Sequence, residues 1–248
     1  MEIKSKRRSQ IKILIITMLF STALLKSQIT INYDIKKIPE TRNYRIYISI
    51  KNNTDKKYVI PIDTTGFRVY YPDEPVSEFY YEQADRGLGL ILLFKDVDKY
   101  VTGESRSHAF RETDIDDHMS KEYKQKQNTY KKEIDRWRKK YKIKDEDAAK
   151  KNKYLYNSLK ILNPGEILSF YKTFDFLDFN DNKDYYNLYP LEYDKKYNFS
   201  LEYSVDKEIY SNLTSEQKEI FKDYIFLYGR QTSDISQFEV SEEEYKRN

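Results

Sequence analysis

The chain has no cysteine among its 248 residues. Disulfide bonds, thiolate metal ligands, cysteine nucleophiles and the lipid-modified cysteine of bacterial lipoproteins are therefore excluded. Exported eukaryotic domains usually carry disulfides, so their absence favours a bacterial envelope protein if the chain is exported. Glycine and proline are also scarce, with six of each. These are few for an all-β protein of this length.

Common catalytic motifs are missing as well. The sequence contains no G-x-S-x-G nucleophile elbow and no glycine-rich phosphate-binding loop. The only histidines are His108 and His118, which flank Asp114, Asp116 and Asp117 at a spacing that fits no zinc motif. The 41 acidic residues offer too many carboxylate pairs to identify a catalytic one. The sequence therefore indicates no catalytic residue and no cofactor.

Residues 1–27 follow the order of a cleavable secretory signal. A basic start at residues 4–8 precedes an almost wholly apolar run over residues 13–25, and a small residue follows at Ser27. The run is shorter than the roughly 20 apolar residues that span a bilayer, and an uncleaved anchor is the alternative. We therefore predict an exported protein, which is periplasmic, on the outer surface or extracellular.

The net charge of +3 depends on this leader. Residues 1–27 hold six basic residues and one acidic residue, which leaves 38 basic and 40 acidic residues from Gln28 onward. A mature chain with a charge of −2 gives no reason to expect a nucleic-acid partner. Its length of about 220 residues is enough for one sizeable core, or for one domain with a large insertion.

Alternating and continuous apolar stretches predict a β-rich fold. They cover residues 29–35, 44–50, 58–60, 67–71, 88–94, 197–205 and 238–240, whereas residues 95–117 resemble a loop. The sequence Asn163-Pro164-Gly165-Glu166 predicts a type II turn, and we expect residues 159–161 and 167–174 to pair across it. Thr214 and Gln217 predict a capping box that opens a short helix ending near Gly229.

Three segments resemble immunoglobulin-like sandwiches of bacterial secreted proteins, including proteinase-inhibitor domains of the BsuPI type. They are Ile48-x-Ile50-x-Asn52-Asn53-Thr54, residues 159–170 around Pro164-Gly165-Glu166, and Tyr197-x-Phe199-x-Leu201. Asp194-Lys195-Lys196 stands where such domains often carry a glycine. The resemblance implies a fold and does not transfer inhibitor activity.

We therefore expect a mainly β protein, namely an immunoglobulin-like β-sandwich with a long helical insertion and a short C-terminal helix. A signal peptide at residues 1–27 would precede a single domain at 28–241. The insertion would interrupt this domain at about 118–155, and residues 242–248 would form a polar tail.

The insertion combines helix-forming residues with a concentrated positive charge. No glycine or proline occurs over residues 118–151, and residues 121–144 hold 11 basic and three acidic side chains. On a helix, Tyr123, Tyr130 and Trp137 recur every seven residues, and Ile134 and Tyr141 share their face. The alternative to a binding role is that this aromatic stripe packs on the protein itself and leaves the lysines in solvent.

The basic face of this helix predicts contact with an anionic lipid surface, an acidic glycan or an acidic partner protein. The candidate binding residues are Lys124, Lys131, Lys132, Trp137, Arg138 and Lys139.

A second candidate is a calcium loop, since oxygen-bearing side chains alternate at Asp178, Asn180, Asn182 and Asp184. Lys183 stands where the loop needs glycine, and Tyr189 stands where a bidentate glutamate is expected. A polar hairpin loop is therefore the alternative interpretation.

Two classes of function stay open. The first is a non-catalytic binding or structural protein of the cell envelope, which suits a sandwich that presents loops on a rigid frame. The second is a hydrolase of envelope polymers that uses carboxylates which the sequence does not single out. The lack of a nucleophile motif favours the first class. The sequence gives no indication of the oligomeric state.

Overall fold

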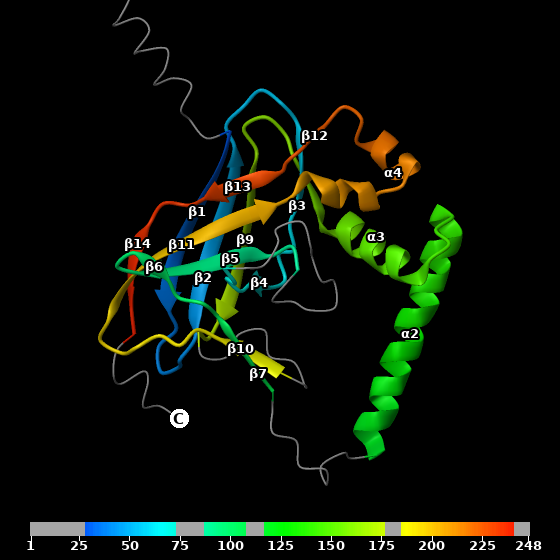
Figure 1. The fold of residues 1–248 in the computed structure, drawn as a ribbon. Helices are drawn as coiled ribbons and strands as arrows, with labels where there is room; N and C mark the ends of the chain where they lie inside the picture. Colours follow the sequence, from blue (N-terminus) through cyan, green and yellow to red (C-terminus); the bar gives the residue numbers. More distant parts are fainter. Residues whose placement is uncertain (1–27, 73–86, 108–116, 177–184, 241–248) are drawn as a thin grey trace, which may run out of the picture.

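The structure is a computed structural model that describes residues 28–72, 87–107, 117–176 and 185–240. Within these ranges the protein is mainly β, because 41% of the residues are in strands and 25% in helices. Several sheets form one body, and the helices gather at one side of it (Figure 1). Among the described residues, no helix combines the length and apolar character that crossing a membrane requires.

The first sheet consists of three antiparallel strands in the order β1-β2-β9. Their bounds are Ile29–Lys37 for β1, Tyr44–Asn52 for β2 and Ile167–Phe174 for β9. In β2, every second side chain from Tyr44 to Ile50 is buried, as the alternating sequence predicts. One face of this sheet therefore lines the core.

The second sheet follows the order β13-β11-β5-β4, and β14 and β6 pair with β11 and β5. The strands are β4 (Phe67–Arg68), β5 (Leu90–Asp96), β6 (Lys99–Tyr100), β11 (Lys196–Val205), β13 (Gly229–Thr232) and β14 (Ser236–Glu239). The pair β4–β5 is parallel, whereas β5–β11 is antiparallel. The continuous apolar sequence of β5 matches its burial on both faces.

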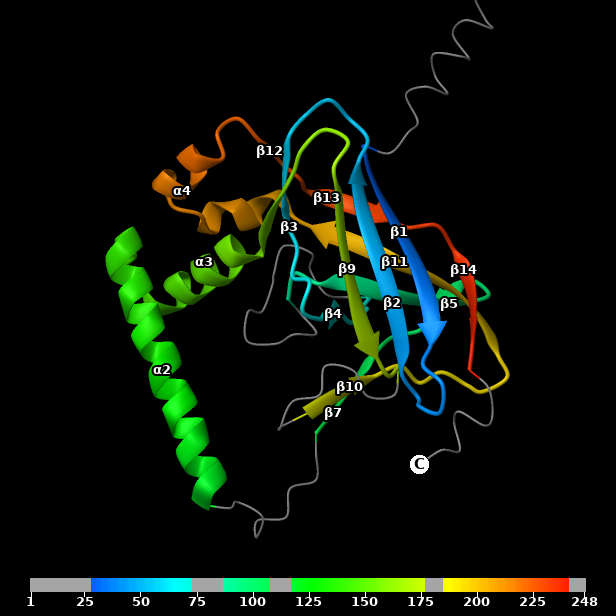
Figure 2. The ribbon, with the colours of Figure 1, turned by 180° about the vertical axis from the view of Figure 1, so that it is seen from behind.

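The two larger sheets pack face to face around an aromatic centre. The Tyr33 ring of the first sheet meets the Phe199 ring of the second edge-on, at a centroid distance of 5.3 Å. Phe94 lies 4.9 Å from Phe199 and 5.2 Å from Phe238, again between ring centroids. The strands of one sheet cross those of the other, which Figure 2 shows from behind.

Two smaller sheets complete the β structure. One has the order β12-β3-β8, with bounds Ile225–Phe226, Tyr58–Pro61 and Leu159–Leu162, and the other pairs β7 (Glu104–Ser107) with β10 (Tyr185–Leu188). Strands β6 and β7 lie within residues 95–117, so the prediction of a plain loop there is wrong.

The turn at Pro164-Gly165 forms, but it does not join two paired strands. Gly165 has a φ of 73°, and the Glu166 N–H donates to the Asn163 carbonyl at 3.0 Å. Strand β8 pairs with β3, however, and β9 pairs with β2, so the predicted pairing is wrong.

The buried Asn52 side chain explains why the chain changes from one sheet to another between β8 and β9. Its amide donates to the carbonyls of Leu162 and Asn163, at 3.2 and 3.0 Å. Its Oδ1 accepts from the Thr54 N–H and hydroxyl. This bonding ties the turn after β2, where the chain passes from the first sheet to the small sheet, to the Pro164-Gly165 turn, where the chain passes back from β8 to β9.

Two helices replace the single helix predicted over residues 118–151. They are α2 (Asp117–Tyr141) and α3 (Glu146–Ser158). Lys142 adopts a left-handed conformation with a φ of 54°, which ends α2. The Asp145 carboxylate then accepts from the Ala148 N–H at 2.7 Å and caps α3.

The C-terminal part contains the 3-10 helix η2 (Lys207–Asn212) and helix α4 (Ser215–Ile220). The predicted capping box is present, since Thr214 and Gln217 satisfy each other's backbone N–H groups. The helix ends at Ile220 and does not continue toward Gly229, because Ile225 and Phe226 pair with β3.

Candidate functional site

Helix α2 is exposed over the part nearer its N-terminus. Every side chain from residue 124 to residue 132 is exposed, including Lys124, Lys131 and Lys132 of the predicted binding set. The helix extends alongside the sheets without lying on them (Figure 1). These lysines are therefore available to a partner.

The C-terminal part of α2 packs against α3. Ile134 is 1% exposed, and Tyr141 is also buried. The Trp137 ring lies 4.6 Å from the Tyr141 ring and 5.7 Å from the Tyr156 ring of α3, measured between centroids. The structure thus places this end of the aromatic stripe on the protein itself.

A buried polar network fixes this contact. The Trp137 indole N–H donates to Asn152 Oδ1 at 2.7 Å. The Asn152 amide donates to the Gln217 side chain and to the Asn212 carbonyl, each at 2.6 Å. Gln217 returns a bond to Asn152 Oδ1 at 3.0 Å. The network therefore joins α2, α3, η2 and α4, and the sequence shows only its Thr214–Gln217 part.

Two of the predicted binding residues thus serve the protein's own packing. Trp137 is held by Asn152. Arg138 lies 3.5 Å from the Asp135 carboxylate and donates to the Lys144 carbonyl just beyond the helix. Lys139 is exposed. The binding set that remains is Lys124, Lys131, Lys132 and Lys139.

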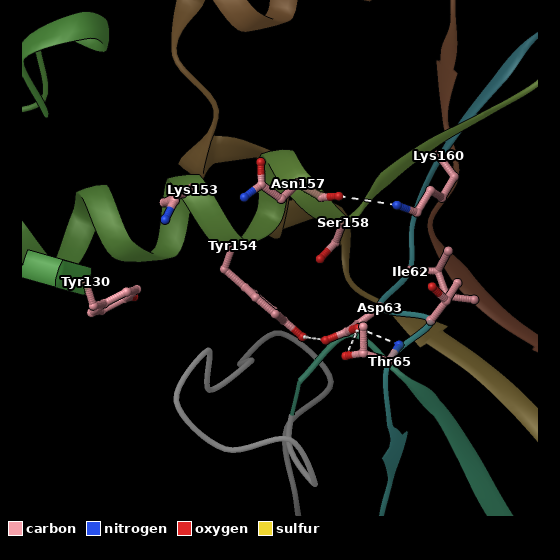
Figure 3. Close-up of a pocket in the computed structure, with 10 residues that line it drawn as sticks. Ile62, Asp63, Thr65, Tyr130, Lys153, Tyr154, Asn157, Ser158 and Lys160 are labelled. Atoms are coloured by element: carbon pink, nitrogen blue, oxygen red, sulfur yellow. Dashed lines mark hydrogen bonds between the residues drawn. The ribbon is translucent and has the colours of Figure 1, made fainter. Parts of the chain in front are cut away.

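A pocket of about 330 Å³ lies where α2 and α3 meet the segment after β3. Figure 3 shows Tyr130 and Lys153 at one side of it and Asp63 and Tyr154 at the other. The Lys153 ammonium bonds the Glu133 carboxylate at 2.6 Å, and this hydrogen bond lowers the pKa of Glu133. The same ammonium lies 5.3 Å from the Tyr130 ring centre.

Asp63 and Tyr154 form a structural joint in this pocket. The Tyr154 hydroxyl donates to Asp63 Oδ2 at 3.0 Å and accepts from the Leu88 N–H at 2.9 Å. Thr65 donates to Asp63 Oδ1 through its N–H and its hydroxyl, at 2.8 and 2.6 Å. Burial raises the pKa of the Tyr154 phenol. Both Asp63 oxygens therefore accept hydrogen bonds from protein groups, and the pair holds α3 against the sheets.

The charged side chains of the pocket make contacts within the protein. Lys153 pairs with Glu133, Lys160 donates to the Asn157 carbonyl at 3.4 Å, and Asp63 accepts from Tyr154. Within the part of the chain that the structure describes, no three histidine or acidic side chains gather as a metal site would require. The sequence carries no signal for this joint beyond the turn-forming Asp63-Thr64-Thr65.

Several predicted residues lie outside the described residues. They include the calcium candidates Asp178, Asn180, Asn182 and Asp184, the histidine His108, and the leader at 1–27. His118 belongs to α2, but its side chain is not described.

Comparison with known proteins gives no relative. The chain matches no protein-family model, no curated protein and no solved structure.

Proposed function

We propose that this is an exported, non-catalytic envelope protein that binds an anionic polymer through the exposed part of α2. The observation that carries the proposal is the exposure of Lys124, Lys131 and Lys132 on a helix segment in which every side chain from residue 124 to residue 132 is exposed. Such a segment gains little stability from tertiary contacts, so its persistence as a helix suits a role in binding.

Among anionic partners, an acidic polysaccharide fits this segment best. Residues 124–132 contain one large apolar side chain, Tyr130, and present no apolar face that would enter a bilayer. Attraction through exposed lysines alone is long-ranged and depends on salt. An acidic partner protein and an anionic lipid surface are the other outcomes that the experiment below distinguishes.

Export and the finer fold belong to the same proposal. The order of residues 1–27 supports cleavage near Ser27, and the intact mass of the protein from the envelope fraction tests it. A mass that retains the leader would contradict export by cleavage. The alternative function is hydrolysis of envelope polymers by a pair of carboxylates, and no particular pair of acidic side chains is assigned to it.

We also propose a distant variant of an immunoglobulin-like sandwich. The antiparallel pairs β1–β2, β2–β9 and β5–β11, and the Asn52 turn beside the Pro164-Gly165 turn, support it. The parallel β4–β5 pair and the crossing of the two sheets are departures, because aligned sandwiches keep their strands within about 30°. An experimental structure in which β1–β2, β2–β9 or β5–β11 paired in parallel would contradict this assignment.

The test of binding is a charge reversal that leaves the packed end of α2 intact. The variant combines Lys124→Glu, Lys131→Glu, Lys132→Glu and Lys139→Glu, and glutamate preserves helix propensity. Polygalacturonate, neutral dextran, anionic vesicles and an acidic peptide serve as probes. We expect salt-sensitive binding of polygalacturonate, with at least a tenfold loss in the variant.

The matched control has the same change of charge at exposed lysines elsewhere, namely Lys51→Glu, Lys56→Glu, Lys196→Glu and Lys218→Glu. It should keep most of the binding if α2 is the site. An equal loss in both variants would show attraction by net charge alone. Preferential binding of vesicles or of the acidic peptide would mean that the partner is a lipid surface or a protein and not a polysaccharide. No binding of any anionic probe would reject the proposal.

A further inference from the structure

An open groove lies on the outer face of the first sheet, which is turned away from the aromatic core. In Figure 2, β1, β2 and β9 lie in front of β5 and β11, so this outer face is toward the viewer. The groove has a volume of about 560 Å³. Pockets for drug-sized ligands measure roughly 300–1,000 Å³, so the groove can take a ligand of that size.

The side chains that line the groove form two neighbouring rows across the three strands. The strand register defines the first row as Asp34 of β1, Tyr47 of β2 and Tyr171 of β9. The second row lies two residues further along each strand and consists of Asn32, Ser49 and Ser169. Because successive side chains alternate between the faces of a sheet, both rows point outward, and the residues between them contribute their backbone to the floor.

Tyr47 and Tyr171 form an exposed aromatic pair in the first row. Their side chains are 41% and 60% exposed. The ring centroids lie 6.0 Å apart, and the ring planes are tilted by 41°. One small ring of a ligand therefore covers only one tyrosine, whereas two linked rings cover both. The C–H face of a sugar ring is apolar and buries area against an aromatic ring, while the sugar hydroxyls stay free for hydrogen bonds.

Two cations contact the tyrosines from the side opposite the groove. Lys36 Nζ lies 5.3 Å from the centre of the Tyr47 ring, and Arg45 Cζ lies 5.3 Å from the centre of the Tyr171 ring. The register places Lys36 beside Arg45, in the row that lies across the tyrosines from Ser49. Cation–π contacts of this kind restrict the rings before a ligand arrives, which lowers the entropy cost of binding.

The groove is suited to a ligand without charge. Asp34 is the only charged side chain among the described residues that line it, and its carboxylate lies 3.1 Å from the Lys36 ammonium. The other polar groups are the Asn32 amide, two serine hydroxyls and two phenols. Amides and hydroxyls both donate and accept hydrogen bonds, as sugar hydroxyls do.

We propose that this groove binds a neutral oligosaccharide of at least two sugar units. Tyr47 and Tyr171 cover the faces of two consecutive rings, and the side chains of the second row bond the sugar hydroxyls. A protein partner fits less well, because the core of a protein interface is depleted in charged side chains, and Asp34 and Lys36 stand beside the tyrosines. The site is separate from the lysines of α2 and does not depend on the function proposed for them.

The test is calorimetric titration of the full mature protein with neutral sugars. Cellohexaose, maltohexaose and N-acetylchitohexaose are the chains, and glucose and N-acetylglucosamine are their single units. We expect at least one hexaose to bind about thirtyfold or more tightly than its own monosaccharide, because the chain stacks on both rings. This exceeds the roughly sixfold statistical advantage of six equivalent units. No binding of any hexaose at millimolar concentrations would overturn the proposal, as would a hexaose advantage no larger than the statistical one.

Substitutions at the two tyrosines locate the binding. Tyr171 is exposed on the edge strand β9, so Tyr171→Ala should leave the fold intact and weaken the hexaose by about tenfold or more. Tyr47→Ala should have a similar effect, whereas Tyr171→Phe keeps the ring and should retain most of the binding. Tyr228→Ala is the matched control, since Tyr228 is 52% exposed and lies between β12 and β13. Binding unaffected by both alanine substitutions in the groove would place the ligand elsewhere and contradict the assignment.

Two further measurements separate this site from other occupants. The charge-reversed α2 variant should keep its binding of the hexaose, and Tyr171→Ala should keep its binding of polygalacturonate. Loss of polygalacturonate binding in Tyr171→Ala would mean that the groove takes an acidic chain and would contradict a neutral ligand. Sedimentation of the free protein tests for a second copy on this face. A dimer that Tyr171→Ala dissociates would identify that copy as the occupant and overturn the proposal.

Discussion

Helices α2 and α3 come from the same charged stretch of sequence, yet they relate to the rest of the protein in opposite ways. α3 buries Ala149, Asn152 and Leu155, and Leu155 belongs to the main hydrophobic core. Among the described side chains of α2, the buried ones are Ile134 and Tyr141 near its C-terminus, and every side chain over residues 124–132 is exposed. Only α2 can be regarded as an appendage, and α3 is part of the folded body.

The difference shows what an aromatic stripe does and does not predict. Tyr130 and Trp137 lie seven residues apart, so helical periodicity predicts the same face and the same burial for both side chains. Tyr130 is nevertheless 38% exposed, whereas Trp137 bonds Asn152. The surface on which α2 packs is only as long as α3, and α2 extends beyond the end of α3. Burial therefore depends on the length of the neighbouring element as well as on periodicity.

The largest effect should come from the core residue of α3. Leu155→Ala removes a fully buried side chain and leaves a cavity, which costs about 3–4 kcal/mol of the free energy of unfolding. Ile134→Ala in α2 should cost less, about 2 kcal/mol, because its surroundings can adjust at the edge of the body. Urea denaturation followed by circular dichroism measures both. Equal costs, or a larger cost for Ile134→Ala, would break the contrast between the helices.

The next effect concerns the polar network between the helices. Asn152→Ala leaves the Trp137 indole N–H and the Gln217 side chain without their buried partner, at a cost of about 2–3 kcal/mol. Trp137 is the only tryptophan, so its emission should also shift to longer wavelength as α2 loosens. Asn157→Ala on the exposed face of α3 is the control and should stay within about 0.5 kcal/mol. An unshifted spectrum in Asn152→Ala would show that the network does not hold α2.

A smaller, pH-dependent effect should appear at the joint between α3 and the sheets. Tyr154→Phe removes the hydrogen bonds to Asp63 and the Leu88 N–H and should cost about 1–1.5 kcal/mol at neutral pH. Burial raises the pKa of Tyr154, so the folded protein holds this proton more tightly than the unfolded chain. The corresponding stability is fully present below about pH 10 and is lost as the pH rises toward the pKa of the folded state.

The free energy of unfolding of the wild-type protein should therefore fall more steeply above about pH 10 than that of Tyr154→Phe. Burial also raises the pKa values of Tyr203 and Tyr210, so the variant should keep part of the alkaline decline. Denaturation curves at several alkaline pH values test this difference. If the free energy of unfolding falls with pH at the same rate in both proteins, ionisation of Tyr154 does not contribute to the loss of stability at alkaline pH.

The sequence predicts the strands better than it predicts how they pair. Alternation locates β1, β2 and β11, because a half-buried strand must place apolar side chains on one face. Pairing partners depend on distant groups. The amide of Asn52 bonds carbonyls at residues 162 and 163, and no local pattern reports a contact across more than a hundred residues. For this reason the turn was predictable and the pairing of β8 with β3 was not.

The candidate sites follow the same division. The basic segment of α2 is visible in the sequence because charge is a local property. Contacts between distant strands are not visible in it, because Arg68, Glu202 and Arg230, for example, come from three strands that only the register brings together. Neither the Asn152 network nor the Asp63–Tyr154 joint could be found without knowing which elements meet.

The smallest effect should be found on the exposed part of α2. Lys131→Ala and Lys132→Ala together should change the free energy of unfolding by less than about 0.5 kcal/mol, because neither side chain is buried. Backbone amides there should exchange with solvent faster than those near Ile134, since an uncovered helix opens locally. Hydrogen exchange along α2 measures this gradient in the free protein. Addition of polygalacturonate should slow exchange over residues 124–132 and leave α3 unchanged. Uniform protection along α2 in the free protein would mean that this segment is already covered, and the contrast between the two helices would then fail.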